Sequence, residues 1–221
     1  MASQFPLAFQ LLPLYVNGLF YYKMQQSSYK RKLILASSSP YRKLMLERLA
    51  IPFDVRTPEV DETPASDETA HTLVARLAAE KAAVVAESLP DAVVIGSDQV
   101  AVAGRRIVGK PGSVANARRQ LSDFSGRDVQ FLSAICVLCR DTGFEYRQTV
   151  VTDVCFRPLN ADEIDRYIQV DQPLNCAGSF KSESLGISLL SAMRSDDPTA
   201  IIGLPLIYVS EALRKAGYNI P

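Results

Sequence analysis

The chain has 221 residues, of which 48% are hydrophobic and 22% are charged, and its 24 basic and 24 acidic side chains give a formal net charge of zero. This composition is typical of a globular protein with enough apolar material for a sizeable core. The balanced charge argues against binding of nucleic acid or a membrane surface through a general positive field, although a small anionic ligand needs only a local basic cluster.

The first part of the chain, residues 1–30, differs in composition from the rest. It contains the apolar and aromatic stretch FPLAFQLLPLYVNGLFYY, which prolines, Gln10, Asn17 and Gly18 interrupt, without a basic segment before it or a small-residue cleavage pattern after it. The stretch is also short for a membrane-spanning helix. We therefore predict an N-terminal extension over residues 1–30 and a single domain over residues 31–221. A signal peptide or a membrane tether is the alternative for the extension.

From Lys32 onward the sequence alternates between predicted strands and helices, which indicates an α/β fold. Strands are predicted at residues 32–36, 92–95, 129–139, 146–156 and 187–193, with a further hairpin over residues 100–108 and an extended segment over residues 52–60. Helices are predicted at residues 40–49, 68–87, 113–121, 160–169 and 206–216. Three of these helices start with a typical capping residue, namely Ser39, Ser113 and Asn160. The longest is expected to bury Leu73, Leu77, Val84 and Val85.

The sulfur and imidazole side chains offer little chemistry. Cys136 and Cys139 form a C-x-x-C pair inside a predicted strand, without the second ligand pair that a zinc site requires, and the single histidine, His71, begins a helix. We expect these thiols, together with Cys155 and Cys176, to be reduced and buried in a cytoplasmic protein. Acid–base chemistry in this chain would therefore use carboxylates and lysines.

Polar clusters stand at the ends of predicted elements, where α/β folds usually build their sites. In ASSSPYRK a strand passes through three serines into a helix that carries Arg42, which suits an anion site but is equally explained by simple helix capping. The acidic run EVDETP could hold a divalent cation or form a solvated loop. Asp98 follows Gly96 and Ser97 at the expected end of a buried strand, where a carboxylate needs a hydrogen bond, an ion pair or a metal.

Basic side chains complete this set. Lys110 precedes a turn in VGKPGS, and Lys81 stands on the predicted long helix, where a surface position is the alternative. The segment CAGSFKSE brings Lys181 and Glu183, or is a polar linker. Together the clusters suit metal-assisted attack of water on a polyphosphate.

The motifs also match a known pattern from about Lys32 to the C-terminus. In order, the chain carries LILASSSPYRKLML, EVDETP, RLAAEKA, IGSDQV, GKP, CAGSFKSE and IIGLPL. It resembles the Maf-like nucleoside triphosphate pyrophosphatases. The resemblance implies the Maf/inosine-triphosphatase-like α/β fold, an elongated mixed β-sheet with flanking helices and a central cleft between two lobes. It also implies cleavage between the α and β phosphates, a divalent cation and a homodimer. The sequence does not choose among Mg²⁺, Mn²⁺ and Co²⁺, since oxygen-rich sites accept several metals.

Matching positions carry the family's site residues onto this chain. The resemblance makes Asp98 the proton acceptor and gives Glu62, Lys81 and Lys110 catalytic roles, while Ser38 and Arg42 bind the substrate. Glu62 and Asp98 are the expected metal ligands, and whether Asp98 deprotonates the water or holds the metal is open.

The resemblance also points to a particular branch of the family. Tyr41, Gln99 and Glu183 stand at its specificity positions and resemble the 7-methyl-GTP pyrophosphatase branch, not the branches that act on dTTP and UTP. An aromatic face attracts the cationic methylated base by about 0.5–2 kcal/mol, and the Glu183 carboxylate could accept from the guanine N1–H and N2–H edge. That branch often carries tryptophan at the position of Tyr41, and tyrosine stacks less strongly.

Two other functions are compatible with the same residues. The first is the same chemistry on dTTP, UTP or another modified nucleotide. The second is a non-enzymatic inhibitor of septum formation that binds a division partner. The acids and cations present at every motif position favour an enzyme that removes modified nucleotides from the pool.

Overall fold

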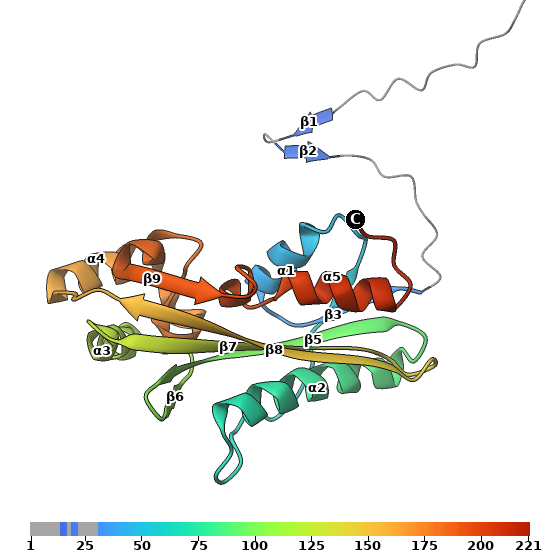
Figure 1. The fold of residues 1–221 in the computed structure, drawn as a ribbon, viewed down its shortest axis with the longest axis horizontal. Coiled ribbons are helices and arrows are strands. Elements are labelled where there is room, and N and C mark those ends of the chain that lie inside the picture. Colours follow the sequence, from blue (N-terminus) through green and yellow to red (C-terminus); the bar gives the residue numbers. More distant parts are fainter. Residues whose placement is uncertain (1–13, 17–18, 22–30) are drawn as a thin grey trace, which may run out of the picture. The chain divides into compact units, whose positions relative to one another are not determined.

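The computed structural model describes residues 14–16, 19–21 and 31–221 (Figure 1). The chain divides into two units, residues 1–30 and residues 31–221. Within the first unit, β1 (Leu14–Val16) pairs antiparallel with β2 (Leu19–Tyr21), and the rest of the predicted extension lies outside the described residues. Among the described helices, none has the length and apolarity required to cross a bilayer.

A seven-stranded mixed sheet forms the centre of residues 31–221, with the strand order β4-β3-β5-β7-β8-β9 and β6 beside β5. In this sheet β3 pairs parallel with β4 and β5, and the other pairs are antiparallel. The strands are β3 (Leu33–Ala36), β4 (Asp54–Arg56), β5 (Val93–Ala103), β6 (Arg106–Val108), β7 (Asp128–Cys139), β8 (Phe144–Phe156) and β9 (Leu190–Ser195).

Helices cover both faces of this sheet (Figure 1). The long α2 lies along one face against β5 and β7, α1 and α5 lie on the other face, and α3 packs on α4 at one end. The helices are α1 (Pro40–Glu47), α2 (Ala70–Ser88), α3 (Val114–Phe124), α4 (Ala161–Asp171) and α5 (Leu206–Lys215). The predicted caps are confirmed, since Ser39, Ser113 and Asn160 each accept a hydrogen bond from a backbone N–H in the first helical turn.

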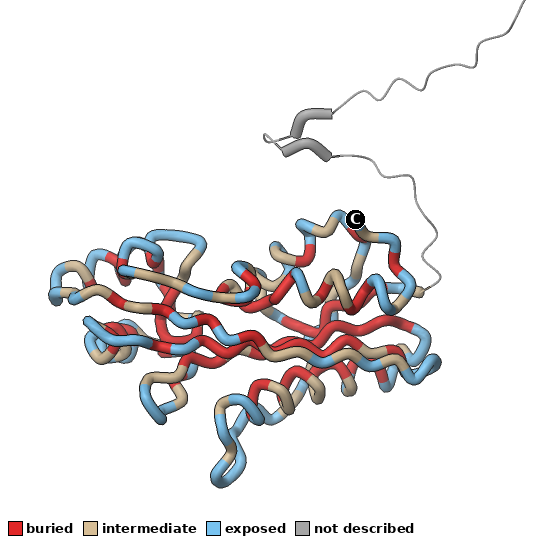
Figure 2. Tube along the Cα trace, viewed as in Figure 1, coloured by how far each residue is buried: buried red, intermediate tan, exposed pale blue. Residues whose placement is uncertain are grey.

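The buried side chains form two hydrophobic clusters that share the sheet. One lies beneath α2 and includes Leu77 and Val85, and the other lies between α3 and α4 and includes Phe124 and Phe180. Figure 2 shows that the buried residues run along the central strands. The predicted α/β fold, with an elongated mixed sheet and two lobes, is therefore confirmed.

The predicted end of the strand before Gly96 is wrong. The strand β5 continues through Gly96 and Asp98 to Ala103, because Gly96 and Asp98 pair with β7 and Ala103 pairs with β6. A Cβ atom at Gly96 would lie 2.1 Å from the backbone oxygen of Ala78, so glycine lets α2 cross β5 at close range. Asp98 consequently lies inside a central strand, directly under the helix that carries Lys81.

Other local predictions need correction as well. Lys81 is buried, whereas Val84, expected on the buried face, lies at its edge and is 40% exposed. Residues 187–189, predicted as strand, belong to a 3₁₀ turn (Leu185–Leu189). The carboxylate of Asp171 holds this turn by accepting from the Gly186 N–H at 3.2 Å.

The cysteines were expected to be buried, and this prediction is right for two of them. Cys136 and Cys139 are buried in β7, whereas Cys155 and Cys176 are half-buried. All four thiols are free. The singleton cysteines therefore lie nearer the surface than the composition argument suggested.

Candidate active site

A cavity of about 760 Å³ opens between the two lobes. Its walls include Leu73 and Leu77 from the cluster beneath α2 and Phe180 and Ile201 from the other cluster. This volume lies within the range of about 300–1,000 Å³ that small-molecule sites occupy. Every site residue that the sequence predicted lines this cavity: Ser38, Tyr41, Arg42, Glu62, Lys81, Asp98, Gln99, Lys110 and Glu183.

The lysine on α2 joins two carboxylates at the floor of the cavity. Its Nζ lies 2.6 Å from Asp98 Oδ1 and 2.5 Å from Glu62 Oε1. The side chains of Lys81 and Asp98 are 7% and 10% exposed, whereas that of Glu62 is 53% exposed. A buried carboxylate without a partner is costly, and Lys81 supplies the partner that Asp98 needs inside β5.

The loop that carries Glu62 is fastened to α2 by an arginine. Arg76 binds both carboxylate oxygens of Glu68 at 2.8 Å and donates to the backbone oxygen of Thr63 at 3.2 Å. The contact with Arg76 lowers the pKa of Glu68 from its ordinary 4.5 to about 2. Two points of attachment on α2, Arg76 to Thr63 and Glu68, and Lys81 to Glu62, therefore hold the loop that carries Glu62.

Arg42 approaches the carboxylates from the first turn of α1. Its Nε donates to the Gly203 carbonyl at 3.0 Å, and its Nη1 donates to Ser37 Oγ at 3.3 Å. Desolvation lowers the pKa of the Arg42 guanidinium, and the charges of Asp98 and Glu62 oppose that shift. The Arg42 guanidinium therefore lies close enough to Asp98 and Glu62 for the negative charge of both carboxylates to stabilise its positive charge.

Further cationic and hydroxyl groups surround this space. Lys110 and Ser38 are exposed to the cavity. Partial burial raises the pKa of Glu62, but Lys81, Lys110 and Arg42 outweigh it, so that the pKa lies below its ordinary value. The site thus keeps Glu62 ionised and places positive charge around both acids, an arrangement that suits a polyanionic ligand with a metal ion.

The three predicted specificity residues lie on separate segments of the wall. Gln99 Nε2 lies within hydrogen-bonding distance of Ser133 Oγ and the backbone oxygens of Ala200 and Ile201, at 2.9–3.0 Å. Its amide oxygen is therefore the atom that it can offer to a ligand. Glu183 is exposed at the opening, on the loop after Phe180.

Tyr41 keeps a neutral phenol beside a cation. Burial raises the pKa of its hydroxyl to about 12, and Lys181 Nζ lies 5.7 Å from the centre of its ring. A base that stacks on Tyr41 must therefore use the face that Lys181 leaves open or displace the ammonium.

Three further residues of interest, Ser37, Ser97 and Cys176, were not among the predicted site residues. Ser37 accepts from Arg42, and Ser97 Oγ donates to the Gly203 carbonyl at 2.9 Å. Cys176 lines the cavity, and burial raises the pKa of its thiol, which keeps it protonated. One local signal could have identified the two serines, because Ser37 and Ser97 directly precede the predicted site residues Ser38 and Asp98.

The two acids of the cavity, Asp98 and Glu62, can supply only some of the ligands that a divalent cation needs. Across the residues that the structure describes, no group of three or more His, Cys, Asp or Glu side chains is arranged to bind a metal ion. Asp98 and Glu62 each use one carboxylate oxygen for Lys81, which leaves a second oxygen on each. Mg²⁺ is commonly bound by one or two carboxylates together with substrate phosphates, so these residues fit a cation that arrives with a triphosphate.

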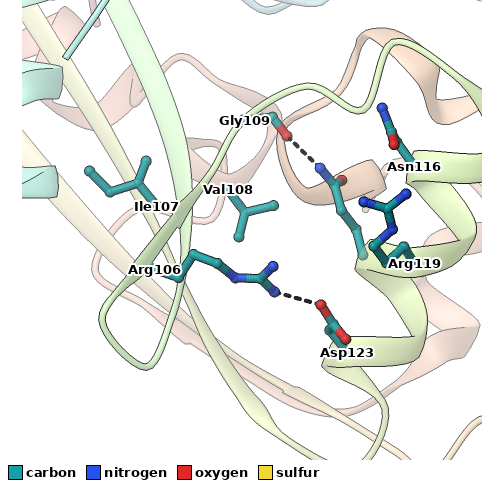
Figure 3. Close-up of a pocket in the computed structure, with 8 residues that line it drawn as sticks. Arg106, Ile107, Val108, Gly109, Asn116, Arg119 and Asp123 are labelled. Atoms are coloured by element: carbon teal, nitrogen blue, oxygen red, sulfur yellow. Dashed lines mark hydrogen bonds and ion pairs between the residues drawn. The ribbon is translucent and has the colours of Figure 1, made fainter.

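A smaller depression of about 200 Å³ lies between β6 and α3 (Figure 3). Arg106 spans it and binds Asp123 at 2.6 Å, and Gln120 Nε2 donates to the Gly109 carbonyl at 3.2 Å. None of the predicted site residues lines it. Arg106 and Asp123 already satisfy each other here, and the candidate active site is therefore the larger cavity, which the predicted site residues line.

Comparison with known proteins identifies the family. Residues 32–216 match the profile of the Maf-like protein family. A protein named 7-methyl-GTP pyrophosphatase from Aromatoleum aromaticum is 51% identical over 190 residues, which cover 86% of this chain and 98% of that protein. One of the same name from Burkholderia pseudomallei is 52% identical over 192 residues, 86% of this chain and 89% of that protein. The solved structure of the Staphylococcus aureus Ham1 protein covers 57% of this chain and 72% of its own at 17% identity, with a TM-score of 0.43. The chain belongs to the Maf-like protein family.

Proposed function

We propose that this protein is a nucleoside triphosphate pyrophosphatase that hydrolyses 7-methyl-GTP to 7-methyl-GMP and diphosphate. The observation that carries the proposal is the contact of Lys81 with both Asp98 and Glu62, on the floor of a cavity that Arg42 and Lys110 also line. Such a site combines a base, metal-binding oxygens and phosphate-binding cations. The names of the relatives that are about half identical to the chain support the same activity.

In the proposed reaction, water attacks the α phosphorus while the bond from that phosphorus to the α–β bridging oxygen breaks, and diphosphate leaves. Asp98 accepts the proton of the attacking water. Lys81 takes Oδ1 of Asp98, which leaves Oδ2 for the water or for the cation. A divalent cation (Mg²⁺, Mn²⁺ or Co²⁺) would be held by Glu62 and the phosphates, and by Asp98 Oδ2 in the alternative in which that oxygen does not take the proton, and it would supply positive charge to the phosphate oxygens.

The phosphate chain is held by Arg42, Lys110 and Ser38 in this proposal. A guanidinium binds phosphate oxygens through paired, directional hydrogen bonds, and a lysine adds a mobile point charge. Because Arg42 Nε is already bound to Gly203, its terminal nitrogens are the donors that reach the substrate. Fixed cations of this kind hold the phosphate chain in place without reorganisation of water.

The base would be selected by three side chains. The ring of Tyr41 offers an aromatic face to the cationic 7-methylguanine, Glu183 accepts from the N1–H and N2–H groups, and Gln99 presents its amide oxygen. A pyrimidine would place carbonyl oxygens at this edge. These acceptors would face the Glu183 carboxylate, which is also an acceptor, so the pyrimidine should bind less well.

The direct test is a diphosphate-release assay with purified protein, 7-methyl-GTP, GTP, dTTP and UTP, repeated with each of the three cations. The proposal expects the highest kcat/KM for 7-methyl-GTP. The matched variant Glu183→Gln should narrow the gap between 7-methyl-GTP and UTP while keeping activity. Preference for UTP or dTTP in the unmodified protein would assign the chain to another substrate, and no release from any nucleotide would overturn the pyrophosphatase proposal.

The setting of the enzyme is also part of the proposal. A cytoplasmic location suits both a nucleotide substrate and four free thiols, which stay reduced there. The homodimer stays a prediction, which sedimentation of the purified chain would test. The absence of nucleic-acid and membrane partners stays a prediction as well.

A further inference from the structure

One short turn supplies backbone oxygens to two site residues with different proposed roles. We name it the 200–203 turn, comprising Ala200–Gly203. Its Gly203 carbonyl accepts from Arg42 Nε at 3.0 Å and from Ser97 Oγ at 2.9 Å. Its Ala200 and Ile201 carbonyls lie 3.0 Å from Gln99 Nε2. The turn therefore sets the direction of the guanidinium that faces the phosphates and of the amide that faces the base.

A buried carboxylate outside the cavity holds both ends of this turn. Asp197 is 0% exposed and does not line the cavity. Its Oδ1 accepts from the backbone N–H of Thr199 at 2.8 Å and from the Thr199 hydroxyl at 2.6 Å. Its Oδ2 accepts from the Ile207 N–H at 2.7 Å, beyond the turn. One side chain thus ties the residues before the turn to those after it.

Asp197 also supplies the cap that α5 lacks. The residue before this helix is Pro205, which has no side-chain cap bond, and the Ile207 N–H that Asp197 binds lies in the first helical turn. A carboxylate at this end of a helix meets unpaired N–H groups and the positive end of the helix dipole. The Thr199 hydroxyl accepts from the neighbouring Leu206 N–H at 2.7 Å, so Asp197 and Thr199 act together.

The charge of Asp197 is balanced by hydrogen-bond donors. In residues 31–221, where side chains are described, the ion pairs found do not include Asp197. A buried carboxylate that relies on N–H and O–H donors is sensitive to their geometry, and loss of one acceptor leaves a buried donor unsatisfied. A change at this position therefore shifts the turn more readily than a change at the surface.

We propose that Asp197 is a positioning residue that, with Thr199, fixes the 200–203 turn and through its carbonyls orients Arg42 and Gln99. The proposal rests on the proposed function for its kinetic consequences. Its structural consequence, a rigid connection from Thr199 to Ile207, holds whatever the substrate is. In residues 31–221 neither the Lys81 ammonium nor the Asp98 carboxylate is hydrogen-bonded to the turn. A loosened turn should therefore weaken substrate binding and base selection more than the chemical step.

The test compares Asp197→Asn with Asp196→Asn, the same chemical change at the exposed neighbour. Asparagine keeps the size of aspartate, but its amide group has one acceptor and one donor. The donor would face the Ile207 N–H and could not accept its hydrogen bond. Asp197→Asn should raise KM for 7-methyl-GTP about tenfold or more, change kcat by less than about threefold, and reduce the preference over GTP. Asp196→Asn should leave all three values unchanged.

A second pair of variants covers the case in which Asp197→Asn fails to fold. Thr199→Val removes the hydroxyl that binds Asp197 while keeping the branched shape, and Thr199→Ser retains the hydroxyl. The valine variant should reproduce the rise in KM and the loss of base preference, and the serine variant should restore both. An unchanged KM and base preference in Thr199→Val, or a loss confined to kcat, would overturn the proposal.

Amide hydrogen exchange separates this proposal from the proposed function. The amides of residues 199–204, 206 and 207 should exchange at least tenfold faster in Asp197→Asn or Thr199→Val than in the unmodified protein, with Asp196→Asn unchanged. A protein that hydrolyses no nucleotide but shows this pattern would refute the function and retain the positioning role. Equal exchange in all variants would refute the positioning role even if the enzyme is active.

Discussion

Replacing Lys81 with methionine should destabilise the protein far more than the loss of a surface lysine. The variant leaves the Asp98 carboxylate, 10% exposed, without its cation, whereas Glu62, 53% exposed, can regain water. Breaking a buried ion pair by removing one partner costs about 3–5 kcal/mol, and the solvated Glu62 should add little. For a domain of this size, about 3 kcal/mol lowers the melting temperature by roughly 6–12 °C.

Scanning calorimetry in the presence of a chelator measures this effect without a metal ion to replace the ammonium. The matched control is Lys43→Met, which removes a half-exposed lysine paired with Glu47 and should lower the melting temperature by less than about 3 °C. The double variant Lys81→Met/Asp98→Asn should regain most of the loss, because the uncompensated charge is gone. The argument would be refuted if Lys81→Met had the same melting temperature as the unmodified protein. It would also be refuted if the double variant were no more stable than Lys81→Met.

Three further predictions concern the elements around the site. Gly96→Ala should lower the free energy of unfolding in urea by about 1–3 kcal/mol, because the added Cβ meets the Ala78 oxygen at 2.1 Å, whereas Gly109→Ala, whose Cβ meets nothing within 4 Å, should cost little. Arg42→Lys should raise KM for the triphosphate about tenfold in steady-state kinetics, since lysine cannot reproduce the bonds to Gly203 and Ser37, and an unchanged KM would refute this role. The pKa of Glu68 is lowered from 4.5 to about 2, so its ion pair stabilises the fold above pH 4.5 and this contribution is lost as the pH falls toward 2. Glu68→Gln should therefore show a flatter fall of unfolding free energy over that range, and parallel curves would contradict the prediction.

Local signals predicted much of the fold. The caps of α1, α3 and α4 and the long hairpin of β7 and β8 follow from neighbouring residues alone, because capping and tight turns are local interactions. The end of β5 could not be found in this way. In the sequence, Gly96 and Ser97 indicate the end of a strand. In the structure, both residues pair with β7, so the strand continues through them.

The site residues followed from their motifs, but their burial did not. Lys81 stands four residues after Leu77 and four before Val85, which places it in the apolar stripe of the helix. That spacing was a usable signal, although it could not identify the carboxylate opposite. The part played by Ser97 depends on Gly203, which stands 106 residues further along the chain. Contacts across more than a hundred residues arise from the tertiary fold and leave no local pattern.

The most direct test of the account is single-turnover diphosphate release from 7-methyl-GTP by the unmodified protein and by Asp98→Asn. The isosteric amide cannot accept the proton of the attacking water, and general base catalysis contributes about 10²–10⁴-fold. We expect the rate to fall by at least about a hundredfold, with circular dichroism showing a folded protein. A folded variant that retains more than about a tenth of the rate would contradict the role assigned to Asp98 and with it the proposed site.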